Sequence, residues 1–94
     1  MDTIQTASAR VRVFSTKRDS WHVASDEDPP EHIRLANVSL EINGGPEAGF
    51  HLVMTPEGCF TADVWFATLL EALAEALEVF GVDPDGWASE SRRQ

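Results

Sequence analysis

The sequence predicts an α+β fold, in which an antiparallel four-stranded β-meander carries one C-terminal α-helix packed on one face. Two patterns support this prediction. Four segments before residue 67 alternate between apolar and polar residues, which is typical of half-buried strands. The next segment repeats its apolar residues every three or four positions, as amphipathic helices do. The 94 residues suffice for a single domain over 1–94.

Residues 9–15 form the first predicted strand, because valines alternate there with arginines. The small and polar residues 1–8 are expected to form a flexible tail. Residues 16–31 are expected to form a long acidic loop, because prolines interrupt strand pairing and acidic residues favour solvent. Trp21 lies in this segment, and we expect its ring to hold the loop against the domain.

Residues 33–42 form the second predicted strand. Its later part alternates between apolar and polar positions, the apolar ones being Val38, Leu40 and Ile42. Ile33 and Leu35 are out of phase with that set, so we expect a β-bulge near residues 36–37. Asparagine, glycine and proline at 43–46 then predict a turn.

Residues 50–55 and 59–66 form a predicted β-hairpin, joined by a type I turn that proline and glycine favour. The turn fixes which residues face each other across the hairpin. The expected pairs on the outer face are Thr55 with Cys59 and His51 with Asp63. The same face also carries Val53, Thr61 and Trp65, whereas the inner face is apolar throughout.

The predicted helix begins at Thr68, which forms a capping box with Glu71, and ends at Gly81. Its expected buried stripe consists of residues three or four positions apart, namely Leu69, Leu73, Ala76, Leu77 and Phe80. Residues 83–86 predict a turn that returns Trp87 to the domain. Residues 89–94 are expected to form a second flexible tail.

Charge and hydropathy argue against two kinds of partner, nucleic acids and membranes. Acidic residues outnumber basic ones by 16 to 7, which gives a net charge of −9. Such a charge repels phosphate backbones, so we expect no nucleic-acid partner. The only basic cluster, which consists of Arg10, Arg12, Lys17 and Arg18, has no interleaved aromatic residues. The sequence shows neither a signal peptide nor a membrane-spanning segment, so we expect a cytoplasmic protein without a membrane partner.

Cysteine, histidine and aspartate side chains are the candidates for chemistry in this sequence. Cys59 is the only cysteine, so no intramolecular disulfide forms. In the predicted register it lies roughly 13–14 Å from His51, too far for a thiolate–imidazole pair. The His51–Asp63 pair is the orienting half of many catalytic sites, but an open sheet face offers no pocket. No histidine or cysteine spacing matches a metal site, so we expect no catalytic residues, metal or cofactor.

Binding of another protein is therefore the function that the sequence favours. The candidate partner-binding residues are two acidic groups, Glu71, Glu75 and Glu78 on the helix and Asp26, Glu27 and Asp28 in the loop. They predict a non-enzymatic acidic module, immunity- or inhibitor-like, with a basic protein partner. The alternative interface is the outer sheet face, with His51, Val53, Thr61 and Trp65. The second hypothesis is a structural homodimeric subunit, and the third is a small enzyme that uses His51 and Asp63. We also expect the chain itself to form a homodimer.

One segment resembles a group of small uncharacterised bacterial proteins. Residues 63–72 read DVWFATLLEA, residues 78–82 read EVFGV, and Trp87 follows. The pattern is similar to the D-x-W-x-x-[ST]-L-x-E-A segment of that group. Phe66 stands where those proteins usually have histidine. The resemblance implies a strand that leads directly into a helix, and a toxin-neutralising immunity or accessory role.

Overall fold

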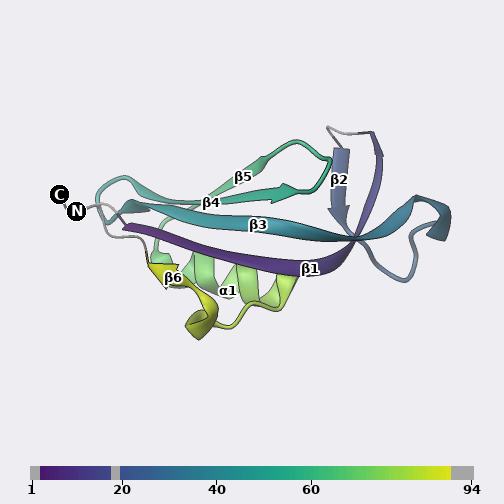
Figure 1. The fold of residues 1–94 in the computed structure, drawn as a ribbon. Coiled ribbons are helices and arrows are strands. Elements are labelled where there is room, and N and C mark those ends of the chain that lie inside the picture. The colour runs from purple at the N-terminus through teal and green to yellow at the C-terminus, as the bar shows by residue number, and fades with distance from the viewer. Residues whose placement is uncertain (1–2, 18–19, 90–94) are drawn as a thin grey trace.

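The computed structural model describes residues 3–17 and 20–89, and it has an α+β architecture. An antiparallel sheet curls into a half-barrel, and one helix packs against its inner face (Figure 1). The elements are β1 (Thr3–Lys17), β2 (Ser20–Val23), η1 (Pro30–His32), β3 (Ile33–Gly45), β4 (Gly49–Pro56), β5 (Ala62–Phe66), α1 (Leu69–Phe80), η2 (Pro84–Gly86) and β6 (Ala88–Ser89). The strand order is β2-β1-β3-β4-β5, with β6 also paired to β1. The predicted α+β class is confirmed, whereas the prediction of four strands is wrong.

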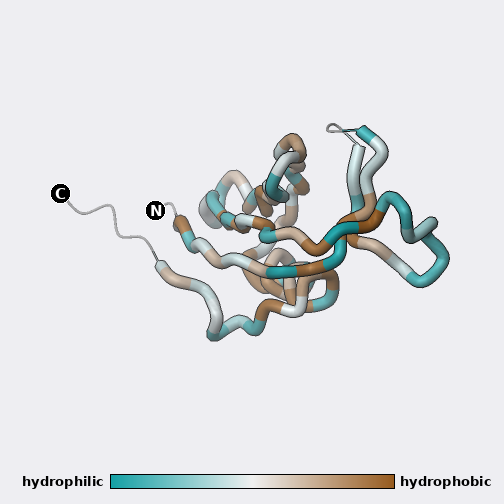
Figure 2. Tube along the Cα trace, turned by 45° about the vertical axis from the view of Figure 1, so that its right-hand side comes forward, coloured by the Kyte–Doolittle hydropathy of each residue, from teal (hydrophilic) through white to brown (hydrophobic). Residues whose placement is uncertain are grey.

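Two strands are missing from the prediction, β6 and β2, and β2 lies inside the expected loop of residues 16–31. It pairs with the end of β1, where Trp21 faces Ser15 and Val23 faces Val13. Trp21 and Val23 thereby pack against the core. The alternating pattern of β2 spans only four residues. It is too short to predict a strand next to the prolines and acidic residues that follow. In Figure 2 the connection from β2 to β3 is indeed hydrophilic.

The first strand starts much earlier than predicted. Residues 3–8 of the expected tail pair with β3, and residues 5–6 also pair with β6. The register between β1 and β3 is unbroken, so the bulge predicted near residues 36–37 is absent. Instead, Leu35 points outward and is 54% exposed. Arg34 takes the inward phase, where its guanidinium donates a hydrogen bond to the Glu57 carbonyl.

The β4–β5 hairpin has the predicted faces but a register displaced by two residues. His51 pairs with Trp65, and Asp63 pairs with Val53. The difference arises at the turn, because β4 continues to Pro56 and β5 starts only at Ala62. Cys59 therefore lies in the connecting loop and not opposite Thr55. A shift of two residues preserves the alternation of side chains, so each residue keeps its predicted face.

The longer loop is fastened to the opposite edge of the sheet. The indole nitrogen of Trp21 donates a hydrogen bond of 2.9 Å to the Phe60 carbonyl. This contact brings β2 to the β4–β5 loop and helps to curl the sheet. Trp21 does anchor its segment, as the sequence predicts, but it does so from a strand.

The core lies between the inner sheet face and α1. Its buried apolar residues are Val13, Ala36, Val38, Leu40, Ile42, Phe50, Leu52, Met54, Ala72, Ala76, Phe80 and Val82. Most of them come from β3 and β4, two neighbouring strands in the interior of the sheet. The strands β1 and β5 add half-buried side chains at the sides of this layer.

Helix α1 has the predicted ends. The Thr68 hydroxyl accepts a hydrogen bond from the Glu71 backbone, and the Glu71 carboxylate accepts one in return, forming a capping box. Such a cap stabilises a helix by about 0.5–2 kcal/mol. Gly81 closes the helix in the left-handed conformation, and the Val82 N–H reaches back to the Ala76 carbonyl.

The buried face of α1 differs from the predicted stripe at two positions. Ala72 is fully buried, whereas Leu77 is 44% exposed. The helix turns its small residues Ala72 and Ala76 toward the sheet, which lets the two layers approach closely. The larger leucine is thereby rotated toward solvent.

The C-terminal segment returns to the sheet as predicted. Residues 84–86 form a turn of 3-10 helix, in which the Gly86 N–H donates to the Asp83 carbonyl at 2.8 Å. Trp87 then packs against the core, and Ala88–Ser89 pairs with β1. Residue 89 of the predicted tail is therefore part of a strand, and residues 90–94 lie outside the described residues.

Candidate functional site

The outer face of the β4–β5 hairpin brings His51 and Asp63 together despite the changed register. His51 Nδ1 lies 2.9 Å from Asp63 Oδ1. The two residues are diagonal neighbours on one face, a separation that these side chains span easily. Both side chains are about half exposed, at 45% and 54%. Solvent at this exposure weakens an ion pair, so the contact contributes little to stability.

The rest of the alternative interface lies on the same face. Trp65 is 55% exposed, and its indole nitrogen donates a hydrogen bond of 3.0 Å to the Ala48 carbonyl. The Thr61 hydroxyl lies 2.8 Å from the Thr55 hydroxyl. Val53 lies half-buried between them. The sequence therefore placed His51, Val53, Thr61 and Trp65 on the correct face, although it misassigned their partners.

A depression of about 320 Å³ lies beside this face. Its lining residues are Thr6, Ala7, Ser39, Leu40, Glu41, Val53 and Thr55. The Glu41 carboxylate accepts a hydrogen bond of 2.8 Å from the Asn43 amide. Hydroxyls and one carboxylate provide polar contacts here, and the lining contains neither His51 nor Cys59.

Cys59 lies in the β4–β5 loop, and its Sγ atom is 3.6 Å from Arg34 Nη2. The thiol is half-buried and outside the core cluster. Its polar neighbour is thus a guanidinium and not an imidazole. The register from which the separation of Cys59 and His51 was predicted is not the observed one.

The helical carboxylates differ in what they contact. Glu71 accepts hydrogen bonds from the backbone N–H groups of Ala67 and Thr68, at 3.2 and 3.3 Å. Glu75 is half-buried and Glu78 is exposed, and neither forms an ion pair within the described residues. Glu71 is therefore committed to the helix cap, and only Glu75 and Glu78 remain available for a partner.

The acidic loop residues form a separate group. Asp26, Glu27 and Asp28 lie between β2 and η1, at the end of the molecule remote from the start of α1 (Figure 1). The structure does not join the two acidic groups that the sequence proposed as one partner-binding set. Each would have to bind a partner independently or at opposite ends of a long interface.

Asp28 organises this loop. Its Oδ2 atom accepts a 2.8 Å hydrogen bond from the Ser25 backbone N–H and lies 3.0 Å from His22 Nε2. The Ser25 backbone hydrogen bond is the main reason that the pKa of Asp28 falls below its ordinary value. Desolvation opposes this shift, and His22 adds to it. The Asp28 carboxylate is therefore engaged by contacts within its own loop.

We expect Asp28→Asn to make stability less sensitive to acid. A carboxylate with a lowered pKa stabilises the fold above the unfolded value of about 3.9, and this contribution disappears as pH falls through the folded value. Thermal melts between about pH 2.5 and 5 measure the effect. Asp28→Asn should lose less Tm over this range than wild type, whereas Asp26→Asn should follow wild type. Equal slopes in all three proteins would contradict the expectation.

The sequence did not reveal an aromatic cluster at the β1–β2 end. The Phe14 ring stacks on the His22 ring with centroids 4.9 Å apart, and the His32 ring meets Phe14 edge-on at 5.9 Å. The cluster depends on Phe14 facing His22 in the β1–β2 pair. Only a correct prediction of β2 would have found it.

Neither a metal site nor a membrane helix emerges from residues 3–17 and 20–89. No three histidine, cysteine or acidic side chains in these ranges are placed to hold a metal ion. None of the helices in the same ranges has the length and apolar character needed to cross a bilayer.

Comparison with known proteins gives no assignment. The chain matches no protein-family model, no curated protein and no solved structure. The resemblance of residues 63–87 to small bacterial proteins therefore stays a prediction. Any inference about function depends on the geometry and charge of this chain itself.

Proposed function

We propose that this protein acts by binding a basic protein partner through the acidic side of the molecule, without catalytic turnover. The observation that carries the proposal is the separation of charge along the chain. Residues 35–89 contain no lysine or arginine, but they contain Glu41, Glu47, Glu57, Asp63, Glu71, Glu75, Glu78, Asp83 and Asp85. The lysine and arginine side chains of the described ranges all lie on β1 and β3.

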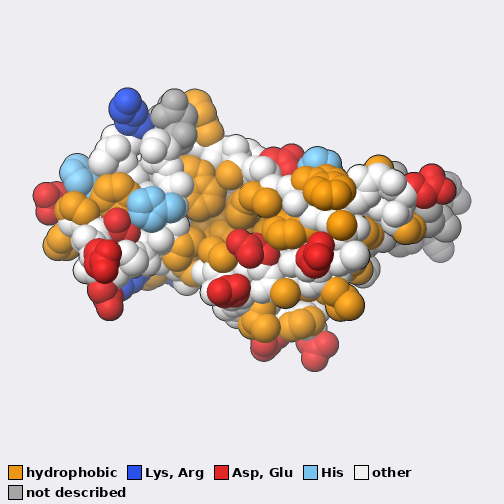
Figure 3. Space-filling model, turned by 180° about the vertical axis from the view of Figure 1, so that it is seen from behind, with side chains coloured by type: hydrophobic (Ala, Val, Ile, Leu, Met, Phe, Trp, Pro, Cys, Tyr) orange, Lys and Arg blue, Asp and Glu red, His pale blue; other side chains and the backbone are white. Residues whose placement is uncertain are grey.

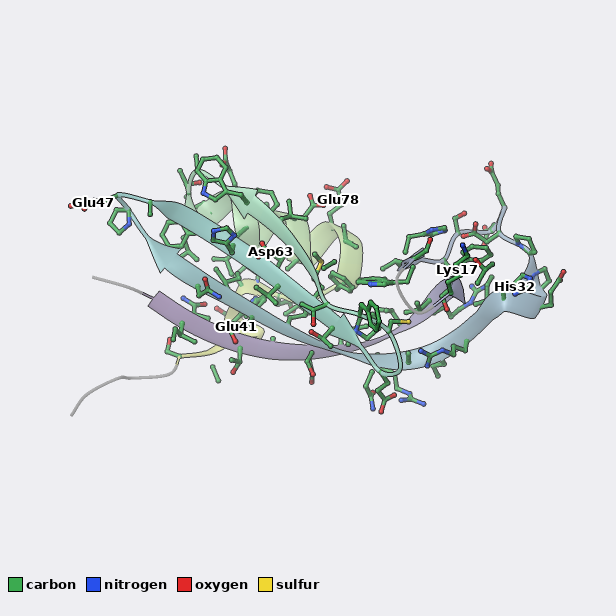
Figure 4. All side chains as sticks on the ribbon, turned by 90° about the horizontal axis from the view of Figure 1, so that it is seen from above. Lys17, His32, Glu41, Glu47, Asp63 and Glu78 are labelled. Carbon is green, nitrogen blue, oxygen red and sulfur yellow. The ribbon has the colours of Figure 1, made fainter. Side chains whose placement is uncertain are left out.

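The spatial arrangement keeps this separation at β5 and α1, whereas Glu57 lies beside Arg34, whose guanidinium donates to its carbonyl. Figure 4 shows Asp63 and Glu78 on the part of the molecule that holds β5 and α1, whereas Lys17 lies at the other end. A field of one sign over a surface accelerates the approach of an oppositely charged protein and lowers its tendency to bind acidic ones. The acidic side therefore favours a basic partner, as an immunity protein or an inhibitor would have.

The His51–Asp63 pair fits the same proposal as a surface contact. Catalysis by such a pair requires a reacting group held within hydrogen-bond reach and shielded from water. Both side chains are about half exposed, and the only cysteine lies in the loop beside Arg34. These features support binding over turnover.

Affinity capture tests the proposal. Immobilised wild-type protein should retain a protein from the host lysate and release it as salt rises, because salt screens opposed charges. The double variant Glu75→Gln/Glu78→Gln should release it at lower salt. The control Glu27→Gln/Glu31→Gln removes the same charge from the connection between β2 and β3, outside residues 35–89, and should behave as wild type. The proposal is wrong if wild type retains nothing, or if both double variants release the protein at the same salt concentration.

A triple reversal of the helical glutamates would be a poorer test. Because Glu71 completes the capping box, its reversal would also weaken the start of α1. Loss of binding could then follow from loss of structure.

A structural homodimer is the second candidate function. It is favoured by apolar exposure on the outer sheet face, where Trp65, which is 55% exposed, lies diagonally beside the half-buried Val53. Exposed apolar surface of this kind often marks an interface. Light scattering at tens of micromolar distinguishes the two candidates, because a monomeric mass would exclude the homodimer.

A further inference from the structure

Helix α1 carries a second apolar face that the fold leaves uncovered. One face of the helix packs on the sheet through Ala72, Ala76 and Phe80. A different set points to solvent, namely Leu70, Ala74 and Leu77. Leu70 is 77% exposed and Leu77 is 44% exposed. We call Leu70, Ala74 and Leu77 the outer stripe.

The outer stripe has the geometry of a helix-docking surface. Its members are four and three positions apart, so they lie on one side of the helix. The two leucines are separated by seven residues, or roughly 10 Å along the axis at 1.5 Å per residue. Ala74 between them leaves room for a side chain of a partner helix. Amphipathic helices dock through apolar anchors at these spacings.

The charge beside the outer stripe indicates what kind of partner covers it. Each member is followed directly in the sequence by a glutamate, and these are Glu71, Glu75 and Glu78. A row of carboxylates therefore runs beside the apolar row. Figure 3 shows carboxylates standing among hydrophobic side chains on this side of the molecule. The helix contains no lysine or arginine.

A second copy of this chain fits the outer stripe poorly. A symmetric contact between two α1 helices would bring three further carboxylates to the interface and no cation. Like charges at an interface oppose association. A partner helix with leucine-like anchors and with lysine or arginine beside them fits better. Its anchors would contact the outer stripe, and its cations would pair with the row of carboxylates.

We infer that the outer stripe of α1 is the docking surface for a cationic amphipathic helix of a partner protein. The leucines of the stripe contact the apolar face of that helix, and Glu75 and Glu78 pair with its cations. This inference rests on the proposed function, since it names the surface and the chemistry of the same basic partner. It goes beyond that function by making the contact primarily apolar.

A synthetic probe tests the inference directly. The probe is a fluorescein-labelled peptide of about 18 residues, long enough to form a helix, with leucine at helical spacing and lysine elsewhere. Its binding is measured by fluorescence anisotropy at several salt concentrations. We expect wild type to bind it and the same peptide with glutamate in place of lysine not to bind.

Two pairs of variants separate the apolar and charged contributions. Leu70→Gln/Leu77→Gln should weaken binding at least about tenfold, because the anchors are lost. Leu35→Gln removes an exposed leucine from β3 and should bind as wild type. Glu75→Gln/Glu78→Gln should bind more weakly and with a shallower dependence on salt than wild type. Circular dichroism should show unchanged helix content in every variant, since none of the replaced side chains belongs to the buried core.

Two outcomes overturn the inference. The first is no binding of the lysine peptide to wild type. The second is equal binding by wild type and Leu70→Gln/Leu77→Gln, which would mean that charge alone attracts the peptide. In either case, the capture experiment tests the proposed function separately. If a host protein is still captured in a salt-dependent way, and the Glu75→Gln/Glu78→Gln variant captures it more weakly, the proposed function stands. Absence of that capture would remove both.

Discussion

We expect Leu40→Ala to lower the free energy of unfolding by about 2–5 kcal/mol, the range for a leucine removed from a packed core. Leu40 is 2% exposed and lies on β3, between β1 and β4. Its side chain belongs to the cluster that joins the sheet to α1. Loss of these contacts leaves a cavity that the neighbouring strands cannot close, because both are fixed by their pairing with β3.

The same strand provides the control. Leu35 is 54% exposed on the opposite face of β3, and Leu35→Ala should change stability by about 0.5 kcal/mol or less. Urea unfolding followed by tryptophan fluorescence measures both variants. For a domain of this size, Leu40→Ala should lower the Tm by about 8 °C or more. Similar losses in the two variants would mean that the sheet faces are misassigned.

The second large effect is expected from Gly44→Ala at the end of β3. Gly44 has a φ of +141°, a conformation that residues with a side chain rarely adopt. A Cβ atom there would lie 2.1 Å from the Gly49 carbonyl oxygen, which belongs to the backbone of the next strand. The strands must separate or the residue must rotate, so we expect a loss of about 1–3 kcal/mol.

Gly86→Ala is the matched control for this prediction. A Cβ atom at Gly86 would meet the Val82 side chain at 3.5 Å, an ordinary van der Waals contact. This variant should unfold at nearly the same urea concentration as wild type, whereas Gly44→Ala should unfold earlier. If Gly44→Ala is as stable as Gly86→Ala, β3 and β4 do not approach each other as closely at this turn as the structure indicates.

The parts of the fold that the sequence predicts well are those governed by local rules. The alternation at Val38, Leu40 and Ile42 correctly assigned the buried face of β3. Thr68 and Gly81 marked the ends of α1, because capping needs only residues within one turn. These signals do not depend on what packs against the element.

The parts that it predicts poorly depend on distant contacts. Strand β2 is stabilised by its pairing with β1 and by the hydrogen bond from Trp21 to Phe60, neither of which a short polar segment reveals. The hairpin register failed for a related reason. The turn chemistry favoured a short loop, but Pro56 is buried in β4 opposite Val38, so the tertiary fold lengthened the loop.

In the candidate site, too, local spacing predicts some features, and others depend on tertiary packing. Helical spacing correctly placed Glu71, Glu75 and Glu78 on one side of α1. It did not reveal that the cap occupies Glu71, because one carboxylate can serve either role. Nor did it reveal the exposure of Leu77, which depends on how the alanines of α1 seat on the sheet.

Strand β1 pairs with β2, which is close to it in the sequence, and with β6, which is far from it. This difference sets an order for folding. One edge of β1 is shared by β2, which follows after a short connection, and by β6, in which Ser89 faces Gln5 across 84 positions. Closing the larger loop has the higher entropic barrier, so the nearby strands assemble first. During synthesis on the ribosome, the early part of β1 therefore keeps an open edge until residue 89 has emerged. For this interval the nascent chain exposes unpaired backbone that a neighbouring nascent chain can bind.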